Sequence, residues 1–246
     1  MISTLVIIVP GLGYLVSELD ELIEFLAFKA QVVVFKYDSV QAENVTKDSS
    51  NGTPFVSALS QFCKQLSDGS NLILLGHSFG GLLAHLVERQ HSVEIAEMIL
   101  IDPMTELQFS VLPPLLPSPA TDEHKSLSDF RDFIEREWKE PSFNKYSIDI
   151  PLYLDLLKEP RRESNTNVTV VSANTFTHDS PYIFPEPHAT RLQLAWLGLH
   201  RRLLSDFARS QLVLASNSNH YVHRFEPHVI IAQVNAAISR IGVCDA

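Results

Sequence analysis

Six short runs of apolar, β-rich residues constrain the fold of this chain more than any other feature of its sequence. The runs cover residues 5–9, 32–35, 72–75, 98–101, 168–171 and 212–214. Each is too short for a helix, and each is continuously apolar, which is typical of parallel strands that are covered on both faces. Helical stretches lie between them, so the alternating order predicts a right-handed, mostly parallel α/β sheet.

The intervening stretches carry the apolar stripes of helices. Thr53-Pro54 supplies an N-cap residue and a first-turn proline, and Pro227 opens a last helix that should run to about Ile241. A long amphipathic segment covers residues 192–207. We expect the first strand inside the sheet, the second and sixth strands at its edges, and helices on both faces.

About 65 residues separate the fourth run from the fifth, where a crossover normally takes far fewer. This insertion begins with an apolar, proline-rich part and continues with a predicted helix over residues 127–138. We interpret residues 104–166 as a small helical lid within a single domain that covers residues 1–246. An inert surface connection is the alternative for the proline-rich part.

Composition excludes several classes of protein. The 246 residues include 19 Lys and Arg against 29 Asp and Glu, a formal charge of −10, so nucleic acid and anionic membrane surfaces are not expected partners. No apolar run reaches the roughly 18 residues of a membrane span. Cys63 and Cys244 offer no disulfide framework and no cysteine metal site. Residues 1–10 are interpreted as a strand, not a signal peptide, which predicts a cytoplasmic protein.

The segment Gly76-His77-Ser78-Phe79-Gly80 joins the third run to a helical stretch. Glycines on either side of Ser78 let the strand reverse sharply into the helix and leave the serine with strained backbone angles. The helix N-terminus points its free N–H groups at the same place, which favours an oxyanion there. A turn that only packs the helix is the alternative, but the context favours Ser78 as a nucleophile. His77 is expected to pack or to lie at the surface.

With this motif, nearly the whole chain resembles the α/β-hydrolase superfamily. The first strand ends in Pro10-Gly11-Leu12-Gly13, where family members carry a glycine-containing loop. The resemblance implies that the backbone N–H groups of Leu12 and Phe79 form the oxyanion hole. Family members more often have His before this glycine, and Pro10 removes that side chain without removing the donor. The opening antiparallel hairpin of larger members is missing, which predicts a reduced α/β-hydrolase fold of about six parallel strands.

The chain order of this fold is Ser, then acid, then His. The resemblance of residues 212–227 to the family implies that His220 is the base, whereas His223 is expected to pack or lie at the surface. The acid has two candidates. Asp102 directly follows the fourth run, and Asp179 comes eight residues after the fifth. We favour Asp102 by its position and keep Asp179 as the alternative acid. A local turn before proline is the other role open to Asp102.

The loop after the first predicted strand also contains a pattern that is typical of a different class of protein. Gly11-x-Gly13-x-x-Val16 after a strand is similar to a dinucleotide-binding fingerprint, with Asp38 in the place of the ribose acid. The third glycine is replaced, and the spacing to Asp38 exceeds the usual ~20 residues. This interpretation is disfavoured.

The resemblance implies a serine hydrolase for an ester, lactone or thioester, with an acyl-enzyme intermediate and no metal or organic cofactor. Phe109 and Leu112 in the insertion favour a small hydrophobic substrate and are candidate substrate-binding residues. A carbon–carbon bond hydrolase or cyclase, or a ligand receptor with slow hydrolysis, is the alternative function on this fold. The sequence does not indicate an oligomeric state.

Overall fold

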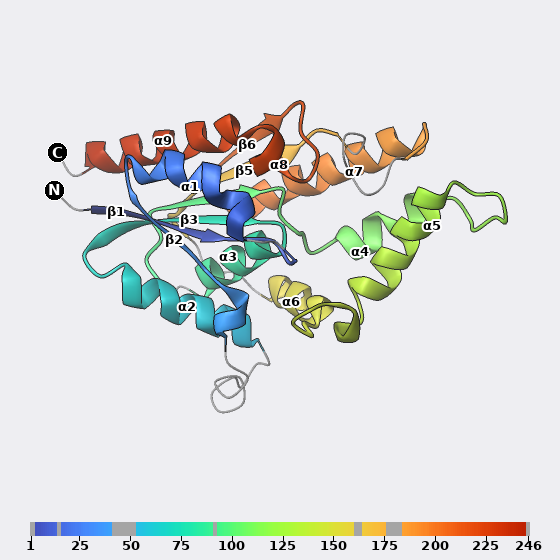
Figure 1. Cartoon of the computed structure of the whole chain (residues 1–246), viewed down its shortest axis with the longest axis horizontal. Helices are drawn as coiled ribbons and strands as arrows, with labels where there is room; N and C mark the ends of the chain where they lie inside the picture. Colours follow the sequence, from blue (N-terminus) through green and yellow to red (C-terminus); the bar gives the residue numbers. More distant parts are fainter. Residues whose placement is uncertain are drawn as a thin grey trace.

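Six parallel strands form one sheet in the order β2-β1-β3-β4-β5-β6 (Figure 1). The computed structural model describes residues 3–13, 16–40, 53–90, 93–159, 164–175 and 184–244. The strands are β1 (Ser3–Val9), β2 (Gln31–Val34), β3 (Ser70–His77), β4 (Glu97–Ile101), β5 (Asn167–Ala173) and β6 (Arg209–Ala215). The predicted six parallel strands, with β1 inside the sheet and β2 and β6 at its edges, are confirmed.

Side chains of successive strand residues point into two apolar cores. Leu5 and Ile7 of β1 belong to one core, and Val6 and Ile8 belong to the other. This alternation follows from the two-residue repeat of a strand. Each core is closed by helices, so the central strands are apolar without interruption.

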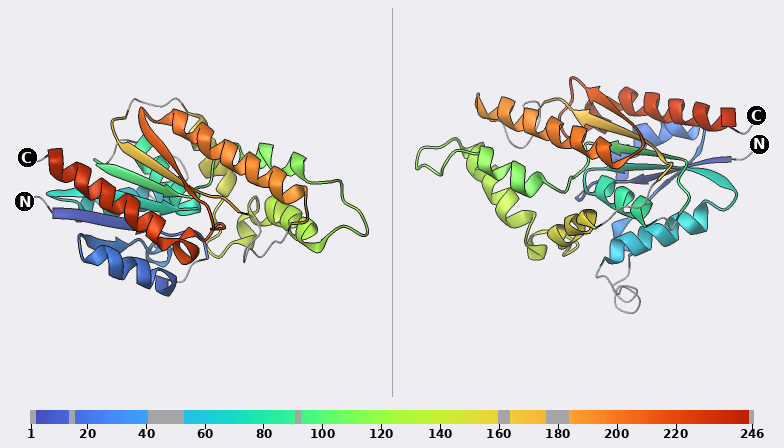
Figure 2. Two further views of the ribbon diagram at one scale, coloured as in Figure 1. Left: turned by 90° about the horizontal axis from the view of Figure 1, so that it is seen from above. Right: turned by 180° about the vertical axis from the view of Figure 1, so that it is seen from behind.

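The helices lie on both faces of the sheet (Figure 2). One face is covered by α1 (Asp20–Ala27) and α9 (Pro227–Cys244), and the other by α2 (Pro54–Leu66) and α3 (Phe79–Arg89). The chain moves from β1 to β2 in one direction and from β2 to β3 in the other, and right-handed connections then place α1 and α2 on opposite faces.

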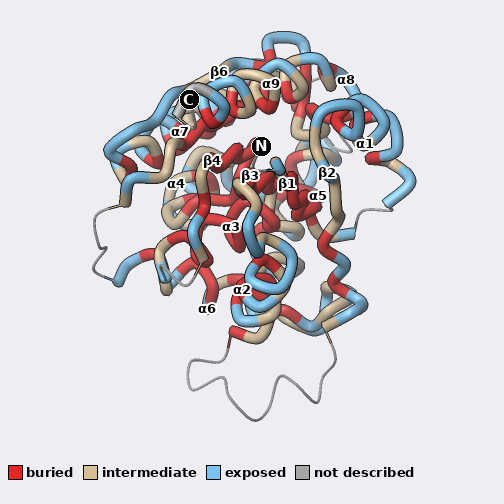
Figure 3. The backbone as a smooth tube through the Cα atoms, turned by 90° about the vertical axis from the view of Figure 1, so that its left-hand side faces the viewer, coloured by how far each residue is buried: buried red, intermediate tan, exposed pale blue. Residues whose placement is uncertain are grey.

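Burial is greatest at the centre of the sheet. In Figure 3 the buried residues gather along β1, β3 and β4, and the outer faces of α1 and α2 are exposed. The edge strands β2 and β6 are only partly buried, because each has a neighbouring strand on one side only.

The segment between β4 and β5 is helical in several short pieces. It contains α4 (Gln108–Val111), α5 (Lys125–Asp132) with a π-helical turn at Phe133–Glu137, and α6 (Ile150–Asp155), with 3-10 turns at Pro113–Leu115, Pro141–Phe143 and Leu156–Lys158. Leu112, Phe130 and Ile134 pack against α7 (His188–Leu203) in a third apolar cluster. The segment lies beyond the C-terminal ends of the strands (Figure 1).

The remaining elements are short. They are α8 (Val222–Phe225) and 3-10 turns at Val16–Leu19, Tyr37–Ser39 and Leu204–Asp206. The long helix after β5 begins four residues before the expected segment and ends at Leu203, where a 3-10 turn leads into β6. Among the described residues, no helix combines the length and apolar character that a membrane span requires.

Candidate active site

Ser78 sits at the sharp turn between β3 and α3. Its backbone angles are φ 54° and ψ −120°, a strained conformation for a residue with a side chain. The turn is possible because the flanking glycines lack side chains. A Cβ atom at Gly76 would lie 2.6 Å from the carbonyl oxygen of Gly80, and one at Gly80 would lie 2.1 Å from the carbonyl oxygen of Val9.

The loop after β1 runs beside this turn. Gly80 is in close contact with the backbone of Val9 and Pro10, so the start of α3 and the end of β1 are packed directly on each other. Leu12 lies in this loop and lines the same cavity as Ser78 and Phe79. As the first residue of α3, Phe79 has no helical acceptor for its N–H. Both N–H groups expected from the resemblance therefore belong to residues that line the same cavity as Ser78.

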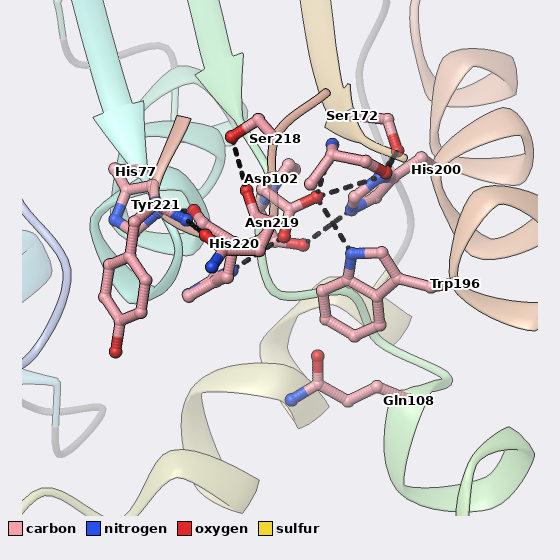
Figure 4. Close-up of polar contacts among 12 residues, drawn as sticks. His77, Asp102, Gln108, Ser172, Trp196, His200, Ser218, Asn219, His220 and Tyr221 are labelled. Carbon is pink, nitrogen blue, oxygen red and sulfur yellow. Dashed lines mark hydrogen bonds and ion pairs between the residues drawn. The ribbon is translucent and has the colours of Figure 1, made fainter. Parts of the chain in front are cut away.

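Asp102 follows β4 directly and holds His220, which lies in the loop after β6. The distance from Asp102 Oδ2 to His220 Nδ1 is 2.6 Å (Figure 4). Asp102 has a positive φ of 41°, and its backbone N–H donates to the carbonyl of Val171 in β5 at 2.7 Å. The strand end thus fixes the direction of the carboxyl group, and His220 lines the same cavity as Ser78.

The second carboxylate oxygen of Asp102 is also satisfied. Oδ1 accepts from the backbone N–H of Ala173 and from the indole N–H of Trp196, each at 2.9 Å. Figure 4 shows Asp102 between His220 on one side and Trp196 and His200 on the other. His200 Nδ1 lies 3.8 Å from Oδ1. The carboxyl group is therefore enclosed by donors.

The hydrogen-bond donors around Asp102 determine whether its carboxyl group is charged. Asp102 is 2% exposed. Burial alone would raise the pKa of its carboxyl group, but the hydrogen bond and the charge of His220, the charge of His200 and the hydrogen bond from Trp196 outweigh it and lower the pKa to about 2. Asp102 is ionised at neutral pH and can keep the Nδ1 of His220 protonated.

Hydrogen bonds in the loop that carries His220 join residues before His220 to residues after it. Glu226 accepts from the backbone N–H of Asn217 at 2.8 Å, and the side-chain oxygen of Asn219 accepts from the N–H of Tyr221 at 2.8 Å. Asn219 is buried. These bonds replace the regular hydrogen bonds that a loop lacks.

His77 lies beneath His220. Its Nε2 is 2.8 Å from the backbone oxygen of His220, and the two rings are 4.6 Å apart. Burial, together with His220 and His223, lowers the pKa of His77 well below its usual range, so the ring is neutral and donates from Nε2. His223 is buried against His77. Sequence reasoning gave His77 only a packing or surface role and missed this contact.

The role of Trp196 was also missed. Sequence reasoning placed it only on the apolar stripe of a helix, and its hydrogen bond to Asp102 depends on how α7 lies against β5. His200 is buried one turn further along α7 and contacts the oxygen of Pro103 and the hydroxyl of Ser172. A tryptophan in an apolar stripe carries no signal that its N–H faces a carboxylate.

A cavity of about 310 Å³ lies between the strand ends and the segment that follows β4. Its lining is mostly apolar and aromatic and contains no Lys or Arg among the described residues. Leu112 lines it, whereas Phe109 does not and packs its ring 5.4 Å from that of Trp138, which does. The lining residues are Leu12, Ser78, Phe79, Asp102, Met104, Leu112, Phe130, Phe133, Trp138, Phe143, Asn144, Ile150, Ala173, Thr175, Gln193, Trp196, Asn219, His220 and Tyr221.

Two further expectations concern this region. Asp179, the alternative acid, lies outside the described residues. Within the ranges that the structure covers, no group of three or more His, Cys, Asp or Glu side chains is arranged to hold a metal ion.

A model of the alpha/beta hydrolase family matches residues 6–234. The match covers most of the chain, and the chain belongs to this family. The predicted superfamily is thereby confirmed, and with it the fold that the six strands form.

One protein with a named activity is similar to part of this chain. A protein of Mycoplasma genitalium named "Putative esterase/lipase 2" is 36% identical over 80 residues, which are 32% of this chain and 29% of that protein. The match therefore spans less than a third of the relative's length.

Solved structures share the fold over almost the whole chain. A carboxylesterase of Nitrososphaera gargenis has a TM-score of 0.56 and 14% identity over 97% of this chain and 92% of its own. RedJ, a thioesterase of the prodiginine pathway in Streptomyces coelicolor, has a TM-score of 0.55 and 14% identity over 95% and 90%. MenH from S. aureus has a TM-score of 0.55 and 11% identity over 96% and 94%. These identities show a common fold.

The glycine contacts make a stability prediction. Gly80→Ala should lower the free energy of unfolding by about 3 kcal/mol, because its methyl group would meet the backbone oxygens of Val9 and Pro10. Gly198→Ala is the matched control. Gly198 is exposed inside α7 with open space around its Cβ position, so the same change should raise the free energy of unfolding by about 0.5–1 kcal/mol.

Urea-induced unfolding of both variants checks this pair. A Gly80→Ala protein as stable as wild type would contradict the close packing of α3 on the end of β1.

Proposed function

We propose that the chain is a serine hydrolase that cleaves a carboxylic ester, lactone or thioester of a small, hydrophobic and uncharged substrate. The observation that carries the proposal is the 2.6 Å contact between Asp102 and His220 at the wall of the cavity that Ser78 also lines. A nucleophile, a base and an ionised acid at one cavity are the parts that acyl transfer needs.

In the proposed reaction His220 takes the proton of the Ser78 hydroxyl through Nε2, and the Ser78 oxygen adds to the substrate carbonyl carbon. The N–H groups of Leu12 and Phe79 stabilise the oxyanion that forms. His220 then gives its proton to the leaving alcohol or thiol, and an acyl-enzyme remains.

Water completes the cycle. His220 takes a proton from the water as the water oxygen adds to the acyl carbon. His220 then gives that proton to the Ser78 oxygen, which leaves the acyl carbon. Asp102 acts through His220, because its carboxylate keeps the proton on Nδ1 and stabilises the imidazolium in both half-reactions. The low pKa of Asp102, about 2, supports this role, since the carboxyl group stays ionised when the imidazolium forms.

The cavity lining supports the proposed substrate class. Without Lys or Arg among its described lining residues, the cavity offers no permanent cation to a phosphate or carboxylate. Its polar amides already have partners: both ends of the Asn144 amide bond to the backbone of Ile148 at 2.8 Å, and Gln193 donates to the oxygen of Ala173 at 2.9 Å. We propose that residues 104–166 act as a lid whose apolar side chains bind the acyl group. The names of the esterase and thioesterase relatives fit the same class of reaction.

Removing the nucleophile tests the proposal. Ser78→Ala should lower kcat by about 10⁴- to 10⁶-fold, because members of a triad act as a unit, while Ser239→Ala on the exposed side of α9 should leave it unchanged. A panel of p-nitrophenyl esters, lactones and acyl thioesters measures turnover, and about one per second or more is in the normal enzymatic range.

A fluorophosphonate probe should label the wild type once, at Ser78. Labelling at another serine, or none, overturns the assignment of the nucleophile. One slow burst without turnover favours the receptor alternative over the hydrolase.

The acid is tested by a pair of variants. Asp102→Asn should lower kcat by about 10⁴-fold, because an amide in this place favours the wrong tautomer of His220, as the same change does in serine proteases. Asp179→Asn should be mild. If Asp179→Asn is the crippling change and Asp102→Asn keeps most activity, the acid lies after β5.

The role of the lid is tested with acyl chains of different length. Leu112→Ala should lower kcat/KM for long acyl esters by about 10-fold and leave acetyl esters nearly unchanged, since one apolar contact in a pocket contributes ~1–3 kcal/mol. Phe109→Ala is the comparison, because Phe109 does not line the cavity and packs on Trp138, which does. Phe109→Ala should lower kcat/KM for long acyl esters less than Leu112→Ala does. Equal losses on long and short esters would mean that Leu112 supports the core instead.

A further inference from the structure

The loop that carries Leu12 has little regular structure of its own. It follows β1 directly, and Gly13 within it has a φ of 82°. The proposed reaction nevertheless requires that the N–H of Leu12 be held about 2.7–3.1 Å from the oxyanion. Contacts from outside the loop must therefore fix the position of the Leu12 N–H.

One side chain bonds this loop from the segment that follows the neighbouring strand, β2. The hydroxyl of Tyr37 donates to the carbonyl oxygen of Pro10 at 2.7 Å, and Pro10 is two residues before Leu12. Tyr37 comes three residues after the end of β2, and the pairing of the strands extends toward it through the bond from the N–H of Phe35 to the oxygen of Ile8 at 2.8 Å. The donor thus belongs to the 3-10 turn Tyr37–Ser39, which begins just beyond the paired end of β2.

The ring of Tyr37 is embedded in aromatic side chains. It lies 5.6 Å from Phe55, 5.3 Å from Tyr146 and 6.2 Å from Phe79, and the residue is 5% exposed. A buried hydroxyl in apolar surroundings is unfavourable unless it is hydrogen-bonded. Burial raises the pKa of the Tyr37 hydroxyl well above its usual range, so the group keeps its proton and acts as a donor.

Tyr37 therefore contacts both sources of the expected oxyanion hole. Its hydroxyl holds the backbone of the Leu12 loop, and its ring packs on the side chain of Phe79, whose N–H is the second donor. The residue does not line the cavity. It can act on the reaction only through the groups that it holds.

We propose that Tyr37 is a positioning residue for the oxyanion hole, which it sets by anchoring Pro10 and packing on Phe79. This inference rests on the proposed serine hydrolase function. Loss of the hydroxyl would free the carbonyl of Pro10 and let the N–H of Leu12 move by a fraction of an ångström. Displacements of this size reduce the stabilisation of a transition state more than the binding of a substrate.

Tyr37→Phe tests the proposal, because it removes the hydroxyl and keeps the ring. We expect kcat for a p-nitrophenyl ester to fall by about 10- to 100-fold with KM within about two-fold of wild type, since loss of a whole oxyanion donor lowers kcat by about 10²–10³. A trifluoromethyl ketone supplies the second measurement. Its carbonyl carbon takes the Ser78 oxygen and its own oxygen becomes the oxyanion, so its inhibition constant should rise by a similar factor.

Tyr153→Phe is the matched control. Tyr153 is also buried, its ring lies 5.4 Å from that of Phe79, and its hydroxyl bonds to the N–H of Phe55 at 3.3 Å instead of to the Leu12 loop. This variant should keep kcat and the inhibition constant within about two-fold of wild type. Urea-induced unfolding of both variants separates lost activity from lost folded protein.

If Tyr37→Phe fails to fold, a variant with 3,5-difluorotyrosine at position 37 is used instead. This residue keeps the ring and makes the hydroxyl a stronger donor. The kcat of this variant should then equal or exceed that of wild type, and a lower kcat overturns the proposal. The proposal is also overturned if Tyr37→Phe retains the wild-type kcat and inhibition constant, or if Tyr153→Phe loses as much.

The two hypotheses fail in different ways. A wild-type protein that neither turns over esters nor takes the fluorophosphonate label removes the hydrolase function and the Tyr37 proposal together. An active wild type with an unaffected Tyr37→Phe variant removes the Tyr37 proposal alone.

Discussion

The buried carboxylate of Asp102 is the group on which the geometry of the site depends. An ionised carboxylate in the interior is unfavourable unless hydrogen bonds replace the lost water. Its partners come from the end of β5, from α7 and from the loop after β6, through Ala173, Trp196 and His220. If one of these elements moved, a charge would be left unsatisfied. The same bonds that stabilise the charge therefore keep His220 in place.

A second constraint is the absence of side chains at the turn around Ser78. Gly80 allows the first turn of α3 to rest on the backbone of Val9 and Pro10, and a methyl group there would be only 2.1 Å from an oxygen. This contact brings the Leu12 loop to the serine, and the Tyr37 hydroxyl bonds to Pro10 in the same loop. In the proposed mechanism, backbone packing and one buried hydroxyl together set the place of the oxyanion.

Much of the fold could be predicted from periodicity. The apolar runs gave the strands within a few residues, because a strand covered on both faces must be apolar throughout. The ends of parallel strands meet at one edge of the sheet, so Ser78, Asp102 and His220, each placed just after a strand, could be expected near one another. Phe109 was harder to place: it lies close to Leu112 in the sequence, yet it faces Trp138 and not the cavity.

By itself, then, the sequence determined the six parallel strands and which of them lie at the edges, the strained serine turn and the positions of the polar residues after the strands, since these depend on local spacing and on chain order. Only the tertiary structure decided that Trp196 donates to Asp102, that His77 bonds the backbone of His220 and that Tyr37 anchors Pro10. These residues resemble ordinary core residues in the sequence. Their roles arise because packing brings polar atoms from distant parts of the chain within about 3 Å of each other, and no local pattern encodes that distance.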